Sequence, residues 1–446
     1  MRVGVVNRVR DHAENLAIAR IVIVALVLFS PETRAFPEAL GIPPGLRTAP
    51  HGLGPFLAHV PMDAATAKVA ADVALGAGAF ALVGLFTRPA LLLLLVAATY
   101  RFALAQFGGT VHHDMHLLWF VAVLAASPSG DALSLDALFE SDEAVRARRT
   151  RAHVDYGLPL AVIRLLLGVV YFFPGFWKLA ESGVAWFWSD NLLHQMDWKA
   201  FETDRVPAFR FGHVPWLVRI AGAGVVLFEL SFGLLATFRR TRPVALVAGL
   251  AFHAATHVLM GIPFVSLWGS YVVLVDVRSL VRRLHGTRDE SGERTPPADV
   301  PMRPSAWIVA TAVALLVPAT VQGFRGDTFA WPFGCYPTFQ WIAGERVPDV
   351  DVTVVSSDGV ESAPIRGRRG RPNAEWSMAW RAAGAYGGVV TDEALRSYAT
   401  WLATKNGVAI PPGSRVRVHR IAWTLAPESW DLPPAERTLI RELTMP

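Results

Sequence analysis

Long stretches of this chain contain almost no charged residue, and they decide which folds are open to it. The run Leu91–Ala98, inside 88–107, is one example. A helix needs about 20 consecutive apolar residues to cross the hydrocarbon core of a bilayer. Runs of this kind recur between residues 14 and 323, and only 18% of the 446 residues are charged, against about 25% in soluble domains. The sequence therefore predicts an all-α polytopic membrane bundle.

We predict nine membrane helices, at residues 14–30, 65–86, 88–107, 114–128, 156–180, 214–238, 243–261, 263–280 and 305–323. The fourth is short, and a partly re-entrant helix is the alternative. The first predicted helix is preceded by basic residues, as the apolar segment of a signal peptide is. Because Arg20 lies inside its apolar run and no small-residue cleavage pattern follows, we expect it to be retained.

The arginines predict the orientation of these helices. With the N-terminus in the cytoplasm, the inner segments hold sixteen arginines, and the outer loops hold five basic residues. Cytoplasmic loops of membrane proteins carry such an excess of basic residues. We therefore expect a multi-pass protein of the cell membrane with residues 324–446 outside the cytoplasm.

Residues 324–446 differ in character from the transmembrane domain expected at 1–323. Val352–Val355 and Arg415–Leu425 have the β-branched, alternating pattern of strands. Between them, Thr391–Asn406 begins with a Thr-Asp cap and ends before Gly407, as an amphipathic helix does. We predict a small extracytoplasmic α+β domain here.

Several other classes of protein are disfavoured by what the sequence contains. The single Cys335 cannot form an intramolecular disulfide. The net charge of +5 follows from the placement of arginines beside a membrane, so we expect no nucleic-acid partner. No P-loop, Gly-rich dinucleotide turn or serine-hydrolase elbow occurs in the sequence, which argues against an ATP-driven pump or a soluble-type dehydrogenase.

Two pairs of segments suggest an internal repeat. Ala19–Ile23, which contains Arg20, is echoed 144 residues later by Ile163–Leu167, which contains Arg164. Thr87-Arg88-Pro89 is echoed by Thr241-Arg242-Pro243. Helices one to four and five to eight would then be two parallel copies, with a pocket at their interface. Chance recurrence of Arg-Pro helix starts is the alternative.

Ionisable side chains inside apolar helices are expensive, and they are candidates for a functional site by default. In the predicted topology several of them end in the outer half of the membrane. We take these as candidate site residues: Arg101, His112, His113, Asp114, Lys178, His253 and His257, with Trp177 beside the lysine.

Lys178 is unusual because the chain has 38 arginines and only four lysines. An ammonium can lose its proton when it is desolvated, whereas a guanidinium effectively cannot. The aromatic setting Tyr171–Trp177 is therefore where a catalytic base would be placed. The alternative is a lysine that reaches the outer interface beside Trp177 and Trp186, within an aromatic belt.

The remaining polar groups have structural as well as functional interpretations. His253 and His257 are one turn apart, but no Glu follows His253 as in a zinc-protease helix, so hydrogen bonding is favoured over metal. We expect no metal at the His112–Asp114 loop either. Glu229 is expected to pair with a buried partner such as Arg20, Arg164 or His253 as part of the structure.

Three short motifs resemble the vitamin K-dependent γ-carboxylase family and the wider bacterial group of HTTM (horizontally transferred transmembrane) domain proteins. The segment Phe173–Leu179 resembles the family's helix end, where a glycine step leads to a lysine followed by leucine. The pair Phe252-His253 and the following Gly261–Phe264 resemble the family's later Phe-His helix. The segment His112–Leu118 resembles its outer-boundary loop. The resemblance covers roughly residues 10 to 285.

By this resemblance, Lys178 would be the base that deprotonates a reduced lipid quinone of the vitamin K type, and His253 would lie near the quinone or a substrate carboxylate. A protein or peptide substrate would bind on the extracytoplasmic side. The chain departs from the family: Trp177-Lys178 replaces a lysine pair, and His112-His113-Asp114 replaces Asn-Asn-His. Residues 324–446, which differ in character, replace the family's large lumenal β-rich region. The alternative function is a non-catalytic HTTM or DoxX-like partner or assembly factor. Its docking surface would be the C-terminal domain, with Trp331–Pro337 as the candidate patch.

Overall fold

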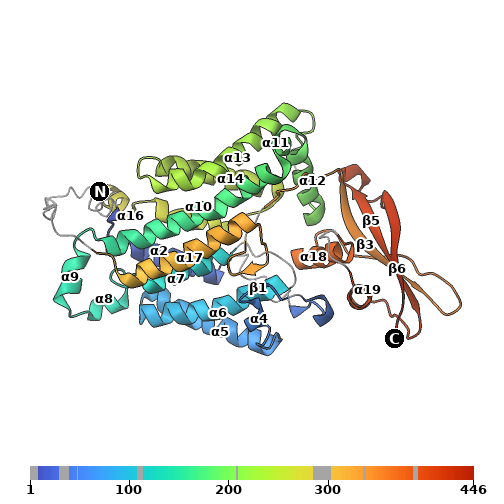
Figure 1. The fold of residues 1–446 in the computed structure, drawn as a ribbon, viewed down its shortest axis with the longest axis horizontal. Coiled ribbons are helices and arrows are strands. Elements are labelled where there is room, and N and C mark those ends of the chain that lie inside the picture. Colours follow the sequence, from blue (N-terminus) through green and yellow to red (C-terminus); the bar gives the residue numbers. More distant parts are fainter. Residues whose placement is uncertain are drawn as a thin grey trace.

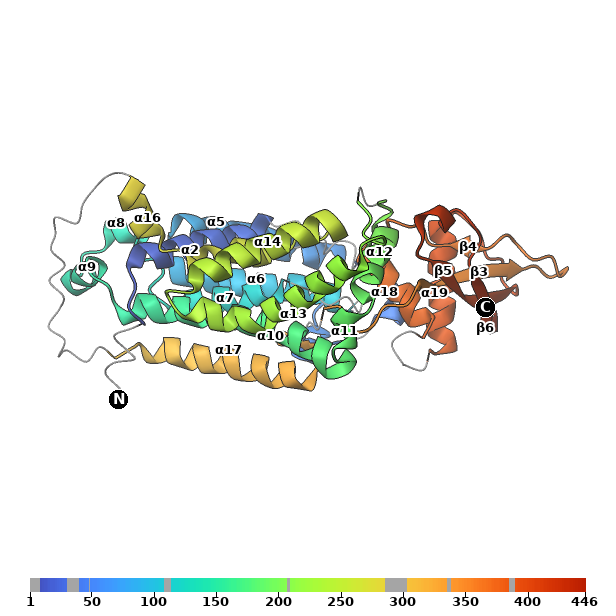
Figure 2. The same ribbon diagram turned by 90° about the horizontal axis from the view of Figure 1, so that it is seen from above.

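The computed structural model describes residues 9–29, 40–47, 49–107, 114–206, 209–284, 303–334, 338–384 and 390–446. An elongated bundle of helices carries a small sheet with two covering helices at one end (Figures 1 and 2). The short helices α8 (Leu135–Phe139), α9 (Glu143–Arg149) and α16 (Val277–Leu284) lie at the opposite end.

In the part of the chain that the structure describes, six helices are long and apolar enough to cross a membrane. They are α5 (Ala64–Val83), α6 (Thr87–Phe107), α10 (Val154–Ser182), α13 (Pro215–Thr237), α14 (Arg242–Met260) and α17 (Ala306–Arg325). They run side by side along the long axis of the molecule (Figures 1 and 2). The chain is therefore an integral membrane protein by the length and composition of its helices.

The other three predicted spans are either shorter than these six helices or interrupted. Helix α2 (Ala13–Phe29) has 17 residues and α7 (Met115–Ala126) has 12. The predicted continuous helix over 263–280 is wrong, because α15 (Val265–Gly269) and the 3-10 helix η4 (Ser270–Leu274) end at an extended Val275. The next residue, Asp276, accepts hydrogen bonds from the Ser279 backbone and the Asn15 side chain, which starts α16 in a new direction.

Shorter elements connect and cover the ends of the bundle. They are η3 (Pro44–Leu46), α4 (Gly54–Leu57), α11 (Ala185–Trp188), α12 (Asn191–Thr203), and the parallel pair β1 (His51–Gly52) and β2 (Ala330–Trp331). The helix ends follow local sequence signals. The Asp63 side chain accepts a hydrogen bond from Thr66 N at the start of α5, and Gly84 ends that helix with φ 68°.

Glycines allow α10 and α13 to cross at close range. A Cβ added to Gly168 would lie 2.8 Å from the Cα of Gly233, and one added to Gly175 would lie 2.9 Å from the Cβ of Glu229. Small residues at a helix interface let the two backbones approach closely, which strengthens packing inside a membrane. The α10–α13 crossing therefore brings Glu229 toward the last turns of α10.

The C-terminal residues form a four-stranded antiparallel sheet in the order β4-β3-β5-β6, with strands β3 (Arg346–Val355), β4 (Ile365–Arg366), β5 (Arg415–Thr424) and β6 (Glu436–Thr444). Helices α18 (Asn373–Ala382) and α19 (Asp392–Lys405) cover it. The two predicted strands and the predicted helix are confirmed. Thr391 caps α19 by accepting a hydrogen bond from Ala394 N.

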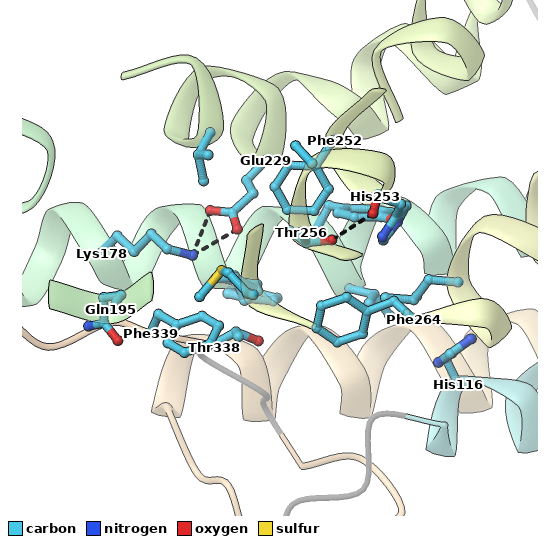
Figure 3. Close-up of a pocket in the computed structure, with 18 of the residues that line it drawn as sticks. His116, Lys178, Gln195, Glu229, Phe252, His253, Thr256, Phe264, Thr338 and Phe339 are labelled. Atoms are coloured by element: carbon cyan, nitrogen blue, oxygen red, sulfur yellow. Dashed lines mark hydrogen bonds and ion pairs between the residues drawn. The ribbon is translucent and has the colours of Figure 1, made fainter. Parts of the chain in front are cut away.

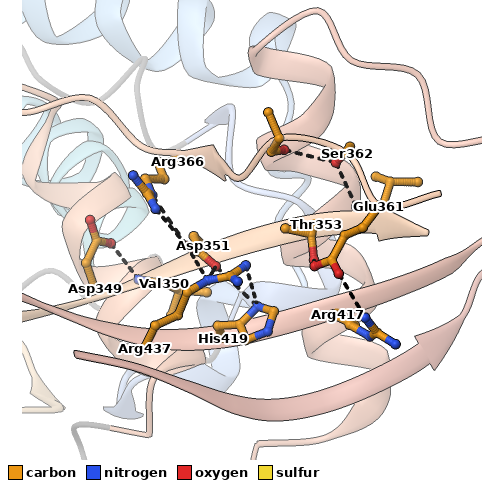
Figure 4. A network of polar contacts seen from close by, with 12 residues as sticks. Asp349, Val350, Asp351, Thr353, Glu361, Ser362, Arg366, Arg417, His419 and Arg437 are labelled. Atoms are coloured by element: carbon orange, nitrogen blue, oxygen red, sulfur yellow. Dashed lines mark hydrogen bonds and ion pairs between the residues drawn. The ribbon is translucent and has the colours of Figure 1, made fainter. Parts of the chain in front are cut away.

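A buried carboxylate ties all four strands of this sheet together (Figure 4). Asp351 on β3 has no exposed side-chain surface and accepts hydrogen bonds from Arg366 and Arg437. His419 on β5 lies 3.2 Å from the same carboxylate and 3.1 Å from the Arg437 guanidinium. Burial, followed by the field of Arg437, lowers the pKa of His419 below its usual value.

The sheet is joined to the bundle by shared cores. Ile42, Tyr100 and Leu104 pack in the same hydrophobic cluster as the sheet and its helices. The segment after α17 is also packed against the bundle: Trp331 is 1% exposed, and Trp119 stacks on Phe333 and donates a hydrogen bond to the Pro332 carbonyl. The proposed docking patch is therefore wrong for Trp331. Residues 335–337, including Cys335, lie outside the described residues.

Candidate functional site

A cavity of about 180 Å³ lies inside the bundle, near the end that carries the sheet. Its walls come from α7, α10, α12, α13, α14 and α17, with the segment around Phe339 closing one side (Figure 3). Most of the lining side chains are aliphatic or aromatic. The polar residues in the lining include His116, Lys178, Gln195, Glu229, His253 and Thr256.

Lys178 and Glu229 form an ion pair in the cavity wall. Lys178 Nζ lies 2.7 Å from Glu229 Oε1 and 2.9 Å from Oε2, and the two side chains are 2% and 6% exposed (Figure 3). The ammonium also lies 5.1 Å from the centre of the Trp186 ring. Lys178 is thus held inside the protein and does not extend to water, which removes the interfacial-anchor alternative.

The predicted partners of Glu229, which were Arg20, Arg164 and His253, are wrong. Neither buried arginine nor His253 contacts it; the carboxylate pairs with Lys178 on the neighbouring helix. Arg20 donates to the carbonyls of Ser129 and Leu133 at 2.7 and 2.5 Å, and Arg164 donates to the carbonyl of Val273 at 2.8 Å. Gly175 explains the pairing, because a side chain there would keep Glu229 away from α10.

A second polar group faces the same cavity from α14. His253 Nε2 lies 2.6 Å from the Tyr171 hydroxyl, which lies 2.6 Å from the Tyr271 hydroxyl. His253 is 3% exposed, and within the described residues its Nδ1 has no hydrogen-bond partner. The rings of Phe252 and Phe264 make edge-to-face contacts with the imidazole, with ring centres 5.2 and 5.7 Å from it. The ring is therefore fixed while one of its nitrogens stays available.

Gln195 contributes an acceptor. Its Nε2 donates to the Trp341 carbonyl at 3.0 Å and to Asn191 Oδ1 at 3.3 Å. A carbonyl can only accept, so the amide nitrogen must face Trp341 and the oxygen must face the other way. That oxygen is buried and has no partner in the described part of the chain.

The other predicted site residues that the structure describes do not line the cavity. Trp177 donates from its indole to the Gly323 carbonyl at 2.8 Å and so joins α10 to α17. His257 is exposed on α14, one turn from His253. Arg101 and Asp114 are buried, but neither lines the cavity. His112 and His113 lie outside the described residues.

Several residues of the cavity were not selected from the sequence. Tyr171 could have been found, since it opens the aromatic run before Lys178 and is one of only seven tyrosines. His116 follows the predicted outer loop and lines the cavity from the first turn of α7. Gln195 gave no signal, because an amide in a polar loop helix is ordinary. In the described ranges, no three His, Cys, Asp or Glu side chains are grouped to hold a metal ion.

Residues 57–277, which contain most of the cavity lining, match the family model of the HTTM domain. The chain carries an HTTM domain. The matched range covers α5 to α15 and includes both partners of the ion pair as well as His253. Comparisons with curated proteins and with solved structures gave no match. The sheet and its covering helices lie outside the HTTM range.

Proposed function

We propose that this HTTM protein is a membrane-embedded enzyme of the vitamin K-dependent carboxylase type, in which Lys178 removes a proton from a reduced lipid quinone. The observation that carries the proposal is the Lys178–Glu229 pair, which is buried in the wall of an apolar cavity that also contains His253. Buried ionisable groups that line a cavity are where catalytic acids and bases are found.

The size and lining of the cavity support a flat apolar ligand. Drug-sized ligands occupy sites of about 300–1,000 Å³, so a cavity of about 180 Å³ accommodates a ring system without its tail. An isoprenoid tail would have to leave between the helices. Two aromatic side chains, Phe252 and Phe264, supply flat surfaces beside His253.

The ion pair provides a way to hold and release one proton. In an apolar site, a lysine and a carboxylate exist either as two ions or as a neutral amine and a neutral acid. The two forms differ by the transfer of one proton between Lys178 Nζ and Glu229 Oε1, which lie 2.7 Å apart. When Glu229 takes this proton, Lys178 Nζ carries a lone pair and can accept the hydroxyl proton of a bound quinol. Glu229 would then act as a positioning residue, and Lys178 would be the catalytic base.

His253 and Gln195 would orient the ring. If Tyr171 donates its hydroxyl proton to Nε2, then Nδ1 of His253 bears hydrogen and donates to a ligand oxygen. Gln195 Oε1 can only accept, so it favours a ligand that carries a hydroxyl hydrogen. A quinol presents such hydroxyls and the oxidised quinone does not, which supports binding of the reduced form.

The finer membrane layout is also a proposal: two parallel halves of four apolar segments each, plus α17. The last segment of the second half is the broken α15–η4 pair. The N-terminus would be cytoplasmic and the sheet extracytoplasmic. A repeated contact supports the two halves. Arg20 bonds the carbonyl of Ser129, 109 residues later, and Arg164 bonds that of Val273, also 109 residues later. The two bonds are related by the same offset of 144 residues that relates Arg20 to Arg164.

The test is oxygen consumption by the full-length protein in lipid nanodiscs after addition of a vitamin K-type hydroquinone. We expect consumption by the parent and none by Lys178→Arg, because a guanidinium keeps the ion pair but cannot give up its proton. Lys199→Arg is the matched control, since Lys199 pairs with Glu202 outside the cavity. Equal rates for Lys178→Arg and the parent would overturn the proposal.

Mass spectrometry of lipids extracted from the purified protein provides a second test. A quinone that co-purifies with the parent, and is lost from a variant with a filled cavity such as Ala255→Phe, would support the enzyme. If neither the parent nor Lys178→Arg consumes oxygen, both are equally stable, and the extract holds no quinone, the non-catalytic partner is favoured.

A further inference from the structure

A second cavity lies at the other end of the bundle, far from the sheet. It has a volume of about 1470 Å³ and is formed where four segments converge: residues 9–15, the first turns of α10, the α13–α14 turn, and the segment from Val272 to Arg283. Of the described residues that line it, eight are arginines and two are aspartates. The catalytic proposal above uses none of them.

The two aspartates offset only part of this charge. Asp276 pairs with Arg239 and accepts further hydrogen bonds from Asn15 and Ser279. Arg278 lies 3.5 Å from Glu14. Asp11 accepts hydrogen bonds from the Asn15 side chain and the His12 backbone. Among the described lining residues the arginines still outnumber the carboxylates, which favours an anionic ligand.

A buried arginine points to the ligand more directly. Arg164 is 5% exposed and lines the cavity, yet within the described residues its only hydrogen bond runs from Nη1 to the Val273 carbonyl. Arg20, its counterpart in the first half, uses both terminal nitrogens on carbonyls. The rest of the Arg164 guanidinium is therefore available to the cavity, and a planar fork of donors matches the oxygens of a phosphate.

The rim of the cavity is suited to a lipid. Helix α16 carries arginines toward the cavity and exposes Leu280 and Leu284, which are 48% and 77% exposed. Phe238, in the α13–α14 turn, is 57% exposed and also lines the cavity. A short basic helix with exposed apolar side chains is typical of a segment that lies in the membrane interface.

We propose that this basic cavity binds the phosphate headgroup of an anionic phospholipid, whose acyl chains lie against the exposed apolar side chains of α16 and the α13–α14 turn. Basic pockets between membrane helices bind such headgroups. A free phosphate ester carries the same anionic group, but it would leave Leu280, Leu284 and Phe238 without a partner. The lipid is therefore the ligand to which we commit, and this proposal does not depend on quinone chemistry.

The experiment uses delipidated full-length protein in a neutral detergent, with binding of short-chain phosphatidylglycerol measured by native mass spectrometry. Phosphatidylcholine is the neutral lipid control, and glycerol 3-phosphate is the soluble anion. We expect phosphatidylglycerol to bind more tightly than either, and its affinity to fall as salt is raised.

Arg240→Gln and Arg283→Gln test the cavity without disturbing the fold, because both side chains are exposed. Each should lower the affinity about fivefold, as expected for a basic residue near an anionic lipid surface. Arg88→Gln is the matched control. Arg88 is exposed and belongs to the motif Thr87-Arg88-Pro89, which corresponds to Thr241-Arg242-Pro243, but it lies outside the cavity. Arg164→Gln should have the largest effect, provided that its melting temperature matches that of the parent.

Three results would overturn the proposal. They are equal binding of phosphatidylglycerol and phosphatidylcholine, parent-like affinity in the Arg240→Gln/Arg283→Gln double variant, and binding of glycerol 3-phosphate as tight as that of the lipid. The last would assign the cavity to a soluble anion. None of these measurements depends on oxygen consumption. The lipid-binding proposal can therefore fail while the quinone proposal holds, and the reverse.

Discussion

Removing one partner of the Lys178–Glu229 pair should cost far more stability than removing both. Glu229→Leu leaves an ammonium, 2% exposed, with no carboxylate beside it. Breaking a buried ion pair in this way costs about 3–5 kcal/mol, whereas replacing both partners with apolar residues of similar volume is often neutral or stabilising. We therefore expect a loss of about 3–5 kcal/mol for Glu229→Leu and for Lys178→Met, and a loss near zero for the double variant.

The assay is a double-mutant cycle on the free energy of unfolding in detergent, followed by tryptophan fluorescence during denaturant titration. Trp186 lies against the lysine and would report on the site directly. The four proteins give a coupling energy, which should be close in magnitude to the sum of the two single losses because the double variant loses almost nothing. Additive losses would refute the reasoning, since they would mean that water reaches the two charges. A folded double variant without oxygen consumption would separate catalysis from stability.

Three other perturbations have clear expected results. Gly168→Ala should destabilise the bundle by about 1–3 kcal/mol, since the new Cβ would lie 2.8 Å from Gly233 Cα; Gly224→Ala, with nothing within 4 Å, should be neutral or stabilising in the same unfolding assay. Because the folded-state pKa of His419 lies below its unfolded value, protonation favours unfolding, and thermal unfolding of the sheet should shift to lower temperature as the pH falls below about 6.5; this shift should shrink in His419→Gln. A periplasmic-type reporter fused after Pro446 should be active only outside the cytoplasm, and activity of a cytoplasmic reporter there would contradict the topology.

The elements that the sequence predicts best are those whose signals are local. The strands predicted at 352–355 and 415–425 follow from β-branched alternation, and α19 follows from its Thr391 cap. The first strand begins earlier than predicted, at Arg346. The six long spans follow from hydropathy alone. The break after η4 was missed although Asp276 has a local capping contact with Ser279. Its second contact, with Asn15, lies 261 residues away and has no local pattern.

The sequence selected Lys178 and His253 for the site, and Glu229 as a structural residue, but none of their contacts. Hydropathy indicates how deep a residue lies along a span, but the face that it presents depends on how helices cross. Lys178 and Glu229 meet because Gly175 and Gly168 allow α10 and α13 to approach, and the sequence gives no direct sign of that crossing. His253 was selected for being ionisable, while its fixation by Tyr171 required the structure.

The helices that the protein covers least also form part of the cavity wall, and this favours a ligand that arrives from the bilayer. In α14 and α17, only 22% and 17% of the spanning residues are buried, against 67% in α6 and α10. Both weakly covered helices line the cavity, through Ala255 and Leu259 on one and Ala319 and Gly323 on the other. A water-soluble substrate would have to cross these apolar walls, which costs free energy for every polar group it carries. A lipid-soluble ring would reach Lys178 from the hydrocarbon beside α14 and α17 without that cost.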